Sequence, residues 1–246
     1  MSEVGAVRRE PEWRRALGAL LARKPAAAGL AVFLVLVLVA VFGPELAPHS
    51  PAAQDYEHIL EPPGRSHLLG TDNLGRDILS RILYGARLSL LVGAGGVLGG
   101  ALVGVPLGLT TGYYGGWYDG VVMRVLDVLL AFPGILLAIG IIALLGPGLP
   151  KVVIAVAVFG VPIFARLVRG STLQVAAREY VQAARAAGAG DLRILALHVL
   201  PNAAAPIVVM LTLRMAQAIL IASALSFLGL GAVPPTPEWG AMLADG

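Results

Sequence analysis

The chain has 246 residues, a mean hydropathy of +0.82, a net charge of +3 and only 13% charged residues. A water-soluble domain of this length needs more charge to cover its surface, so the composition predicts an integral membrane protein. The lack of cysteine excludes disulfides, thiolate metal sites and cysteine nucleophiles. Because the sequence indicates no basic face that carries aromatic residues, we expect no nucleic-acid partner.

Residues 1–24 form a tail with six basic residues: Arg8, Arg9, Arg14, Arg15, Arg23 and Lys24. Residues 25–43 follow as an uninterrupted apolar run. As a helix this run is about 28 Å long, close to the thickness of the hydrocarbon core. A cleaved signal peptide is the alternative, but its apolar core is usually about 7–15 residues long. We therefore expect a retained first transmembrane helix.

Residues 44–83 are more polar and are expected to form a loop that contains a short helix at the membrane interface. Thr71 or Asp72 is predicted to cap the start of this helix. Its apolar stripe has helical spacing and consists of Ile78, Leu79, Ile82 and Leu83.

Residues 84–246 are expected to form the transmembrane core, with further spans near residues 86–110, 121–145, 152–168 and 203–231. In the second span, glycine recurs every four residues at Gly96, Gly100, Gly104 and Gly108. Such a ladder lines one helix face and predicts close packing against another helix. In the third span, Asp127 lies one turn from Arg124 and is expected to pair with it.

The orientation follows from the basic residues near the ends of the spans. Besides the tail, residues 166–193 carry five: Arg166, Arg169, Arg178, Arg185 and Arg193. Four spans separate the two regions, so both are expected in the cytoplasm, together with the N-terminus. The 44–83 loop, which is rich in acidic residues, is expected on the outer side.

A short stretch rich in alanine precedes the fifth span and reads EYVQAARAAGAGDLRILALHVLPN, residues 179–202. Its first half favours a helix that Gly188 ends, and Asp191 is expected to cap a second helix. Pro201 either ends that helix or opens the next one. A rigid pair of helices that leads directly into a span is suited to act as a lever.

The spacing of Gln182-Ala183-Ala184, Gly188 and His198-Val199-Leu200-Pro201 resembles the EAA loop of ABC transporter permeases. Gln182 stands where glutamate is usual, and His198 is common at its position in the dipeptide/oligopeptide/nickel branch. Further stretches resemble the second, C-type permease subunit of that branch: LGTDNLGRDILSRILYGARLSLL, YYGGWYD, RVLDVLLAFPG and SFLGLGAVPPTPEWGAML.

The resemblance implies the type I ABC importer permease fold, which is an all-α membrane bundle. Relatives are expected to have six spans and this chain about five, so the last transmembrane helix is expected to be missing. It places the protein in the bacterial inner (plasma) membrane as a multi-pass subunit. The implied partners are a second homologous permease, two ATPase subunits, an extracytoplasmic substrate-binding protein and membrane lipid. Residues 169–202 become the cytoplasmic coupling loop. Its contacts to the ATPase are expected from Glu179, Tyr180, Gln182, Ala183, Ala184, Gly188, His198, Leu200 and Pro201.

No phosphate-binding G-x-x-x-x-G-K-[ST] motif occurs in the chain, so we expect no cofactor in this subunit, ATP bound by the partners, and no enzymatic activity. An intramembrane enzyme would need paired aspartates in its spans or an H-E-x-x-H motif, and neither is found. An ion-coupled secondary transporter would need buried carboxylates in several spans, and Asp127 is the single clear one. The resemblance leaves the cargo open among dipeptides, oligopeptides and nickel.

Polar residues inside the spans are the candidates for the translocation pathway. Arg214 either lines the pathway or pairs with an acid on a neighbouring helix. The other candidates are Thr212, Gln217 and Ser223, which together with Ser226 either face the pathway or form hydrogen bonds between helices. His198 is expected to pack rather than to bind metal, and no metal site is expected. An internal cap and ion pair is favoured for Asp72, Arg76 and Asp77 over contact with a binding protein.

Overall fold

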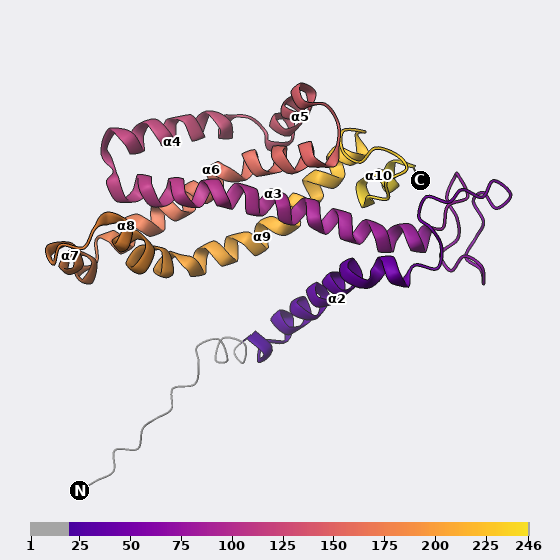
Figure 1. Ribbon diagram of the computed structural model, residues 1–246, viewed down its shortest axis with the longest axis horizontal. Helices are drawn as coiled ribbons and strands as arrows, with labels where there is room; N and C mark the ends of the chain where they lie inside the picture. The colour runs from indigo at the N-terminus through magenta and orange to yellow at the C-terminus, as the bar shows by residue number, and fades with distance from the viewer. Residues whose placement is uncertain (1–19, 246) are drawn as a thin grey trace, which may run out of the picture.

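The computed structural model describes residues 20–245, which form a bundle of helices with no β-strand beyond an isolated bridge between Thr71 and Asp77 (Figure 1). Most of the basic tail therefore lies outside the described residues. The elements are α2 (Lys24–Leu46), α3 (Ile78–Tyr114), α4 (Gly116–Ala131), α5 (Gly134–Leu145), α6 (Leu149–Ala176), α7 (Glu179–Ala186), α8 (Asp191–Ile194), the π-helical turn η1 (Leu195–Val199), α9 (Leu200–Phe227) and α10 (Trp239–Asp245).

Four helical stretches are long and apolar enough to cross a membrane: α2, α3, α6 and the continuous stretch Asp191–Phe227. The bent pair α4–α5 brings the number to five. The expected all-α membrane bundle is confirmed. Several helices are longer than the expected spans, and α3, with 37 residues, is about 55 Å long. The residues expected to form a separate interfacial helix are the first turns of α3.

The glycine ladder of α3 forms the centre of the bundle because it packs directly on α6. A Cβ atom built on Gly104 would lie 2.5 Å from the carbonyl oxygen of Val161, and one on Gly108 would lie 2.5 Å from that of Ala165. Only glycine permits this approach of one helix to the backbone of another. The predicted packing face is confirmed, and Figure 1 shows α3 and α6 lying along each other.

The third expected span is not one straight helix. The chain bends by 92° between α4 and α5, at Phe132 and Pro133. Proline disfavours the helical conformation in the residue before it, and Phe132 is accordingly extended, with φ −88° and ψ 138°. In Figure 1, α4 runs alongside α3 and α6, whereas α5 lies across their end near α10.

The segment of residues 47–77 joins α2 to α3 at the end of the bundle where α10 also lies (Figure 1). The expected cap at Thr71 or Asp72 is wrong, because Asp77 caps α3 by accepting a hydrogen bond from the Ser80 amide at 2.8 Å. Asp72 instead accepts amide bonds from Leu74 and Arg76, which fold the chain into a local turn before the helix.

Charged side chains tie the 47–77 segment to α10. The Arg76 Nε donates to Asp72 Oδ2 at 2.7 Å, and its Nη2 donates to Asp245 at 2.9 Å. Arg81 contacts the same two carboxylates. Burial opposes ionisation of Asp72, but the amide bonds and Arg76 hold its pKa below the usual value. The expected internal ion pair is thus confirmed.

Candidate functional site: a helical elbow and a polar membrane face

The elbow (residues 179–199) consists of α7, α8 and η1 and lies at the end of the bundle opposite α10 (Figure 1). Helix α7 has Glu179 in its first turn and Arg185 in its last turn. A negative charge near the N-terminus and a positive charge near the C-terminus of a helix interact favourably with its dipole. The exposed Gln182 side chain bonds back to its own chain, because its Nε2 donates to the Ala177 carbonyl at 3.3 Å.

The corner of the elbow depends on Gly188, whose φ is +84°. The Ala189 amide donates to the Ala184 carbonyl at 3.1 Å, and the Gly188 amide donates to Arg185 at 3.0 Å. This pair of bonds closes the helix in the manner of a Schellman motif, which needs a left-handed residue at this position. The predicted stop at Gly188 is confirmed.

The second half of the elbow continues without a break into α9. Residues Asp191–Phe227 form one helical stretch that is interrupted only by the π-helical turn η1. There the Leu200 amide donates to Leu195, five residues back, and Pro201 follows in the first turn of α9. A π-turn just before a proline accommodates the missing amide donor. Pro201 therefore opens α9, one of its two expected roles.

Asp191 does not cap the second helix as expected. The N-cap residue is Gly190, and the Asp191 carboxylate accepts a hydrogen bond from the Tyr113 hydroxyl at 2.8 Å. The Arg185 guanidinium lies over the Tyr113 ring, 4.8 Å from its centre. Tyr113 is in the last turn of α3, so it links both arms of the elbow to the bundle.

A small apolar cluster holds the elbow against the ends of α3 and α6. Its buried members are Val175, Val181, Ile194, Leu195 and Val199, and Leu109, Tyr113 and Ala189 pack around them. One face of each elbow helix is thereby fixed against α3 and α6.

The opposite face of the elbow is exposed. Of the expected coupling residues, Ala184 and His198 are half-buried, and the remainder are exposed: Glu179, Tyr180, Gln182, Ala183, Gly188, Leu200 and Pro201. His198 packs edge-on against Tyr180, with ring centres 6.2 Å apart. Leu192 and Leu197 are 81% and 60% exposed. An exposed apolar patch of this kind is typical of a protein docking surface.

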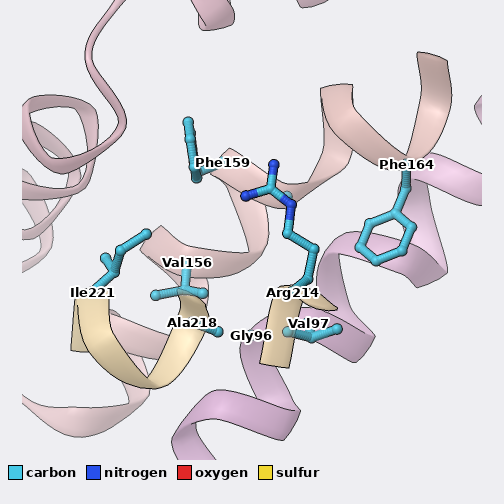
Figure 2. Close-up of a pocket in the computed structure, with 9 residues that line it drawn as sticks. Gly96, Val97, Val156, Phe159, Phe164, Arg214, Ala218 and Ile221 are labelled. Atoms are coloured by element: carbon cyan, nitrogen blue, oxygen red, sulfur yellow. The ribbon is translucent and has the colours of Figure 1, made fainter. Parts of the chain in front are cut away.

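Arg214 of α9 lies among residues of its own helix and α6 rather than beside an acid. Its Nη1 donates to Gln217 at 2.7 Å, and its guanidinium carbon lies 5.5 Å from the ring centre of Phe159. Figure 2 shows the side chain extending from α9 towards Phe159. The cavity beside it is about 20 Å³ and is lined by Val97, Val156, Phe164 and Ala218 among others. A space of this size holds about one water and no peptide.

The other pathway candidates are more scattered. Thr212 is exposed, and its hydroxyl donates to Val209 on its own helix at 2.8 Å. Ser223 is half-buried beneath α10, where a Cβ atom on Gly240 would lie 2.2 Å from the Ser223 carbonyl oxygen. Ser226 is buried, and its Oγ accepts from the Ala232 amide at 3.4 Å. The structure therefore does not bring these residues together with Arg214 into one cluster.

A polar face that the sequence did not indicate lies between α4 and α6 and consists of Asp119, Asp127, Arg166 and Arg169. Arg169 forms two hydrogen bonds of 2.5 Å with Asp119. Asp127 pairs with Arg166, not with Arg124 as expected. These residues surround an open cavity of about 510 Å³. The spacing of Arg124 and Asp127 within one helix predicts a pair between them, whereas the pairing with Arg166 depends on how α4 packs on α6.

Half of the Arg166 and Asp127 side chains is exposed, 51% and 50% respectively. Ionised groups of a transmembrane helix are too costly to leave against lipid tails, and they normally face protein or water. This polar face is therefore the side of the bundle that we expect to meet another subunit or an aqueous path.

Comparison with known proteins agrees with this geometry. Residues 104–246 match the family described as binding-protein-dependent transport system inner membrane component, and residues 12–63 match the N-terminal TM domain of oligopeptide transport permease C.

Among the similar curated proteins is the di/tripeptide transport system permease protein DppC of Pseudomonas aeruginosa, 48% identical over 90% of this chain and 75% of its own length. The dipeptide transport system permease protein DppC of Alkalihalophilus pseudofirmus is 48% identical over 95% of this chain and 77% of its own. The glutathione transport system permease protein GsiD of Pectobacterium atrosepticum is 50% identical over 95% and 76%.

Proposed function

Since the chain belongs to the family of binding-protein-dependent transport system inner membrane components and is a permease subunit of an ABC importer, we propose that it forms half of a translocation pathway for short peptides. Di- and tripeptides and glutathione, the cargoes that the names of its relatives give, are all small peptides with charged ends. A small peptide is thus the cargo best supported. Nickel, the other cargo of the branch, has no counterpart in these relatives' names.

The elbow is the observation that carries the mechanism. One of its faces is fixed to α3 and α6 through buried apolar residues, while its other face is exposed and apolar. Because Asp191–Phe227 is one helical stretch, a displacement of the elbow also displaces the membrane helix α9. In this proposal the ATPase subunits grip the exposed face, and their closure on ATP favours one of two states of the permease.

The pathway itself lies between this chain and a second permease subunit. The cavity beside Arg214 is too small for a peptide, whereas the polar face of α4 and α6 is open and charged. A second subunit that covers this face would enclose an aqueous path beside its ion pairs. An extracytoplasmic binding protein delivers the peptide, ATP stays on the ATPase subunits, and this chain performs no catalysis of its own.

The lever is tested at the corner of the elbow. Valine at position 188 is strongly disfavoured by the φ of +84°, because a β-branched side chain rarely adopts a left-handed conformation. Position 190 provides a matched control, since its φ of −68° and ψ of 152° suit valine and a Cβ there meets no atom within 4 Å. We therefore compare Gly188→Val with Gly190→Val in the complete importer reconstituted in proteoliposomes, measuring dipeptide uptake and ATP hydrolysis.

We expect Gly188→Val to lose most ATP-driven uptake and the stimulation of ATP hydrolysis by loaded binding protein, while Gly190→Val retains both. Normal uptake and stimulation by a correctly assembled Gly188→Val importer would contradict the lever. If the wild-type importer hydrolyses ATP but transports no peptide, the peptide assignment is wrong and the lever remains to be judged with another cargo.

A further inference from the structure

Two histidines and one aspartate from separate parts of the chain meet where the 47–77 segment joins α3. The His67 Nδ1 lies 2.9 Å from Asp77 Oδ1, and the His49 Nδ1 lies 3.7 Å from the same oxygen. The three candidate ligand atoms all lie within 4.8 Å of one another. The two imidazole rings are 4.7 Å apart at an interplanar angle of 34°. No other group of this kind occurs among residues 20–245.

The carboxylate of Asp77 is held so that one oxygen remains for a ligand. Its Oδ2 accepts hydrogen bonds from the Ser80 amide at 2.8 Å and the Ser80 hydroxyl at 2.7 Å. Its Oδ1 faces the two histidines. Asp77 is therefore an oriented carboxylate ligand.

Ser80 also positions His49. The His49 amide donates to the Ser80 Oγ at 3.0 Å, so one buried hydroxyl fixes both the backbone of His49 and the carboxylate of Asp77. The end of α2 is brought close by Gly43, where a Cβ atom would lie 2.9 Å from the Leu83 carbonyl oxygen. The three ligands are thus held by backbone packing as well as by their own contacts.

This geometry suits a transition-metal ion. A tetrahedral zinc ion with nitrogen and carboxylate ligands at about 2.0–2.2 Å keeps its ligand atoms about 3.3 Å apart. The two separations from Asp77 Oδ1, 2.9 Å and 3.7 Å, lie on either side of that value. Two imidazoles and one carboxylate favour zinc and its neighbours in the first transition row over magnesium or calcium, which prefer oxygen ligands.

We propose that His49, His67 and Asp77 form a divalent transition-metal site that fastens the 47–77 segment to the start of α3. The Asp77 side chain is 1% exposed and that of His67 is 12% exposed, whereas His49 is 41% exposed and leaves an entry for the ion. Water completes the coordination on the His49 side. The bound ion joins three points of the chain, and its role is structural.

The site is tested by zinc binding to the full chain, purified without a polyhistidine tag and stripped with a chelator. The variants are His67→Gln, His49→Gln and Asp77→Asn, of which Asp77→Asn keeps a residue able to cap α3. The control is His58→Gln, because His58 lies in the same segment and its ring pairs with the exposed Asp55, away from the three proposed ligands. Metal content is measured by mass spectrometry, affinity by calorimetry, and the thermal midpoint of unfolding with and without Zn²⁺.

We expect one Zn²⁺ per wild-type chain and a rise of several degrees in the thermal midpoint when Zn²⁺ is added. His67→Gln and Asp77→Asn should each weaken affinity at least tenfold and abolish the rise, and His49→Gln should weaken affinity less. His58→Gln should behave as the wild type. Absence of stoichiometric Zn²⁺ binding to the wild-type chain overturns the proposal, as does binding that neither His67→Gln nor His49→Gln weakens.

Discussion

At the scale of single residues, the close packing of α3 on α6 depends on the absence of a Cβ atom at the glycines of α3. Gly104 faces the backbone of α6, and a methyl group there would lie 2.5 Å from the Val161 oxygen and 2.7 Å from the Phe164 Cβ. Both obstacles are parts of a packed helix that cannot rotate away. Gly140 in α5 is also helical, but a methyl group on it meets no atom within 4 Å.

The pair of substitutions Gly104→Ala and Gly140→Ala therefore separates packing from helix propensity. Both exchanges favour the helix by about 1 kcal/mol relative to glycine. At Gly104 the added atom forces α3 and α6 apart, which costs about 1–3 kcal/mol. We expect Gly104→Ala to lower the thermal midpoint of the detergent-solubilised chain and Gly140→Ala to leave it unchanged or raise it. Equal midpoints for the two variants would show that the ladder does not set the distance between the helices.

The sequence was sufficient to predict this ladder because the period of four residues places glycines on one face whatever the partner helix is. The stop at Gly188 was predictable for a similar local reason. The Asp127 partner was not, since Arg124 and Arg166 are both basic and only the packing of α4 on α6 decides between them. The His49, His67 and Asp77 cluster has no spacing motif at all, because its members meet only after α2 and α3 have packed.

At the scale of elements, α4 is tied to α6 by charge on one face. The Asp119 side chain is 16% exposed and that of Arg169 is 34% exposed, so both are partly buried. Removing one partner leaves the other charge uncompensated in a partly buried place, whereas removing both leaves none. Because the chain bends at Pro133, α5 does not extend α4 along α6, and the Asp119–Arg169 pair joins α4 to α6 independently of α5.

Substitutions at this pair should therefore be strongly non-additive. We expect Asp119→Asn and Arg169→Gln each to lower stability and peptide uptake, and the double variant to recover part of both. A coupling of about 0.5–3 kcal/mol is typical of residues in direct contact. Thermal unfolding of the four proteins gives the cycle, and uptake in proteoliposomes gives the functional counterpart. Strictly additive losses would mean that Asp119 and Arg169 act independently, and the polar face would then lose its structural basis.

At the scale of the whole molecule, the two ends of the bundle differ in construction. One end carries the elbow, with an exposed apolar patch and basic residues. The other end carries the 47–77 segment and α10, joined by Arg76, Arg81, Asp72 and Asp245 (Figure 1). The positions of the spans were predictable from hydropathy. The division of the third span into α4 and α5 was not, because Pro133 alone does not reveal whether a helix bends or ends.

The chain's lack of cysteine makes its orientation directly measurable, because a single introduced cysteine is the one reactive thiol. Ala187→Cys marks the elbow and Ala53→Cys marks the 47–77 segment; both alanines are exposed, so the exchanges are matched. The basic residues predict that the elbow is cytoplasmic. A membrane-impermeant maleimide should therefore label Ala53→Cys in intact cells, and Ala187→Cys only after the membrane is opened. Labelling of Ala187→Cys in intact cells would place the elbow outside, beyond the reach of any cytoplasmic ATPase, and the coupling proposal would fail.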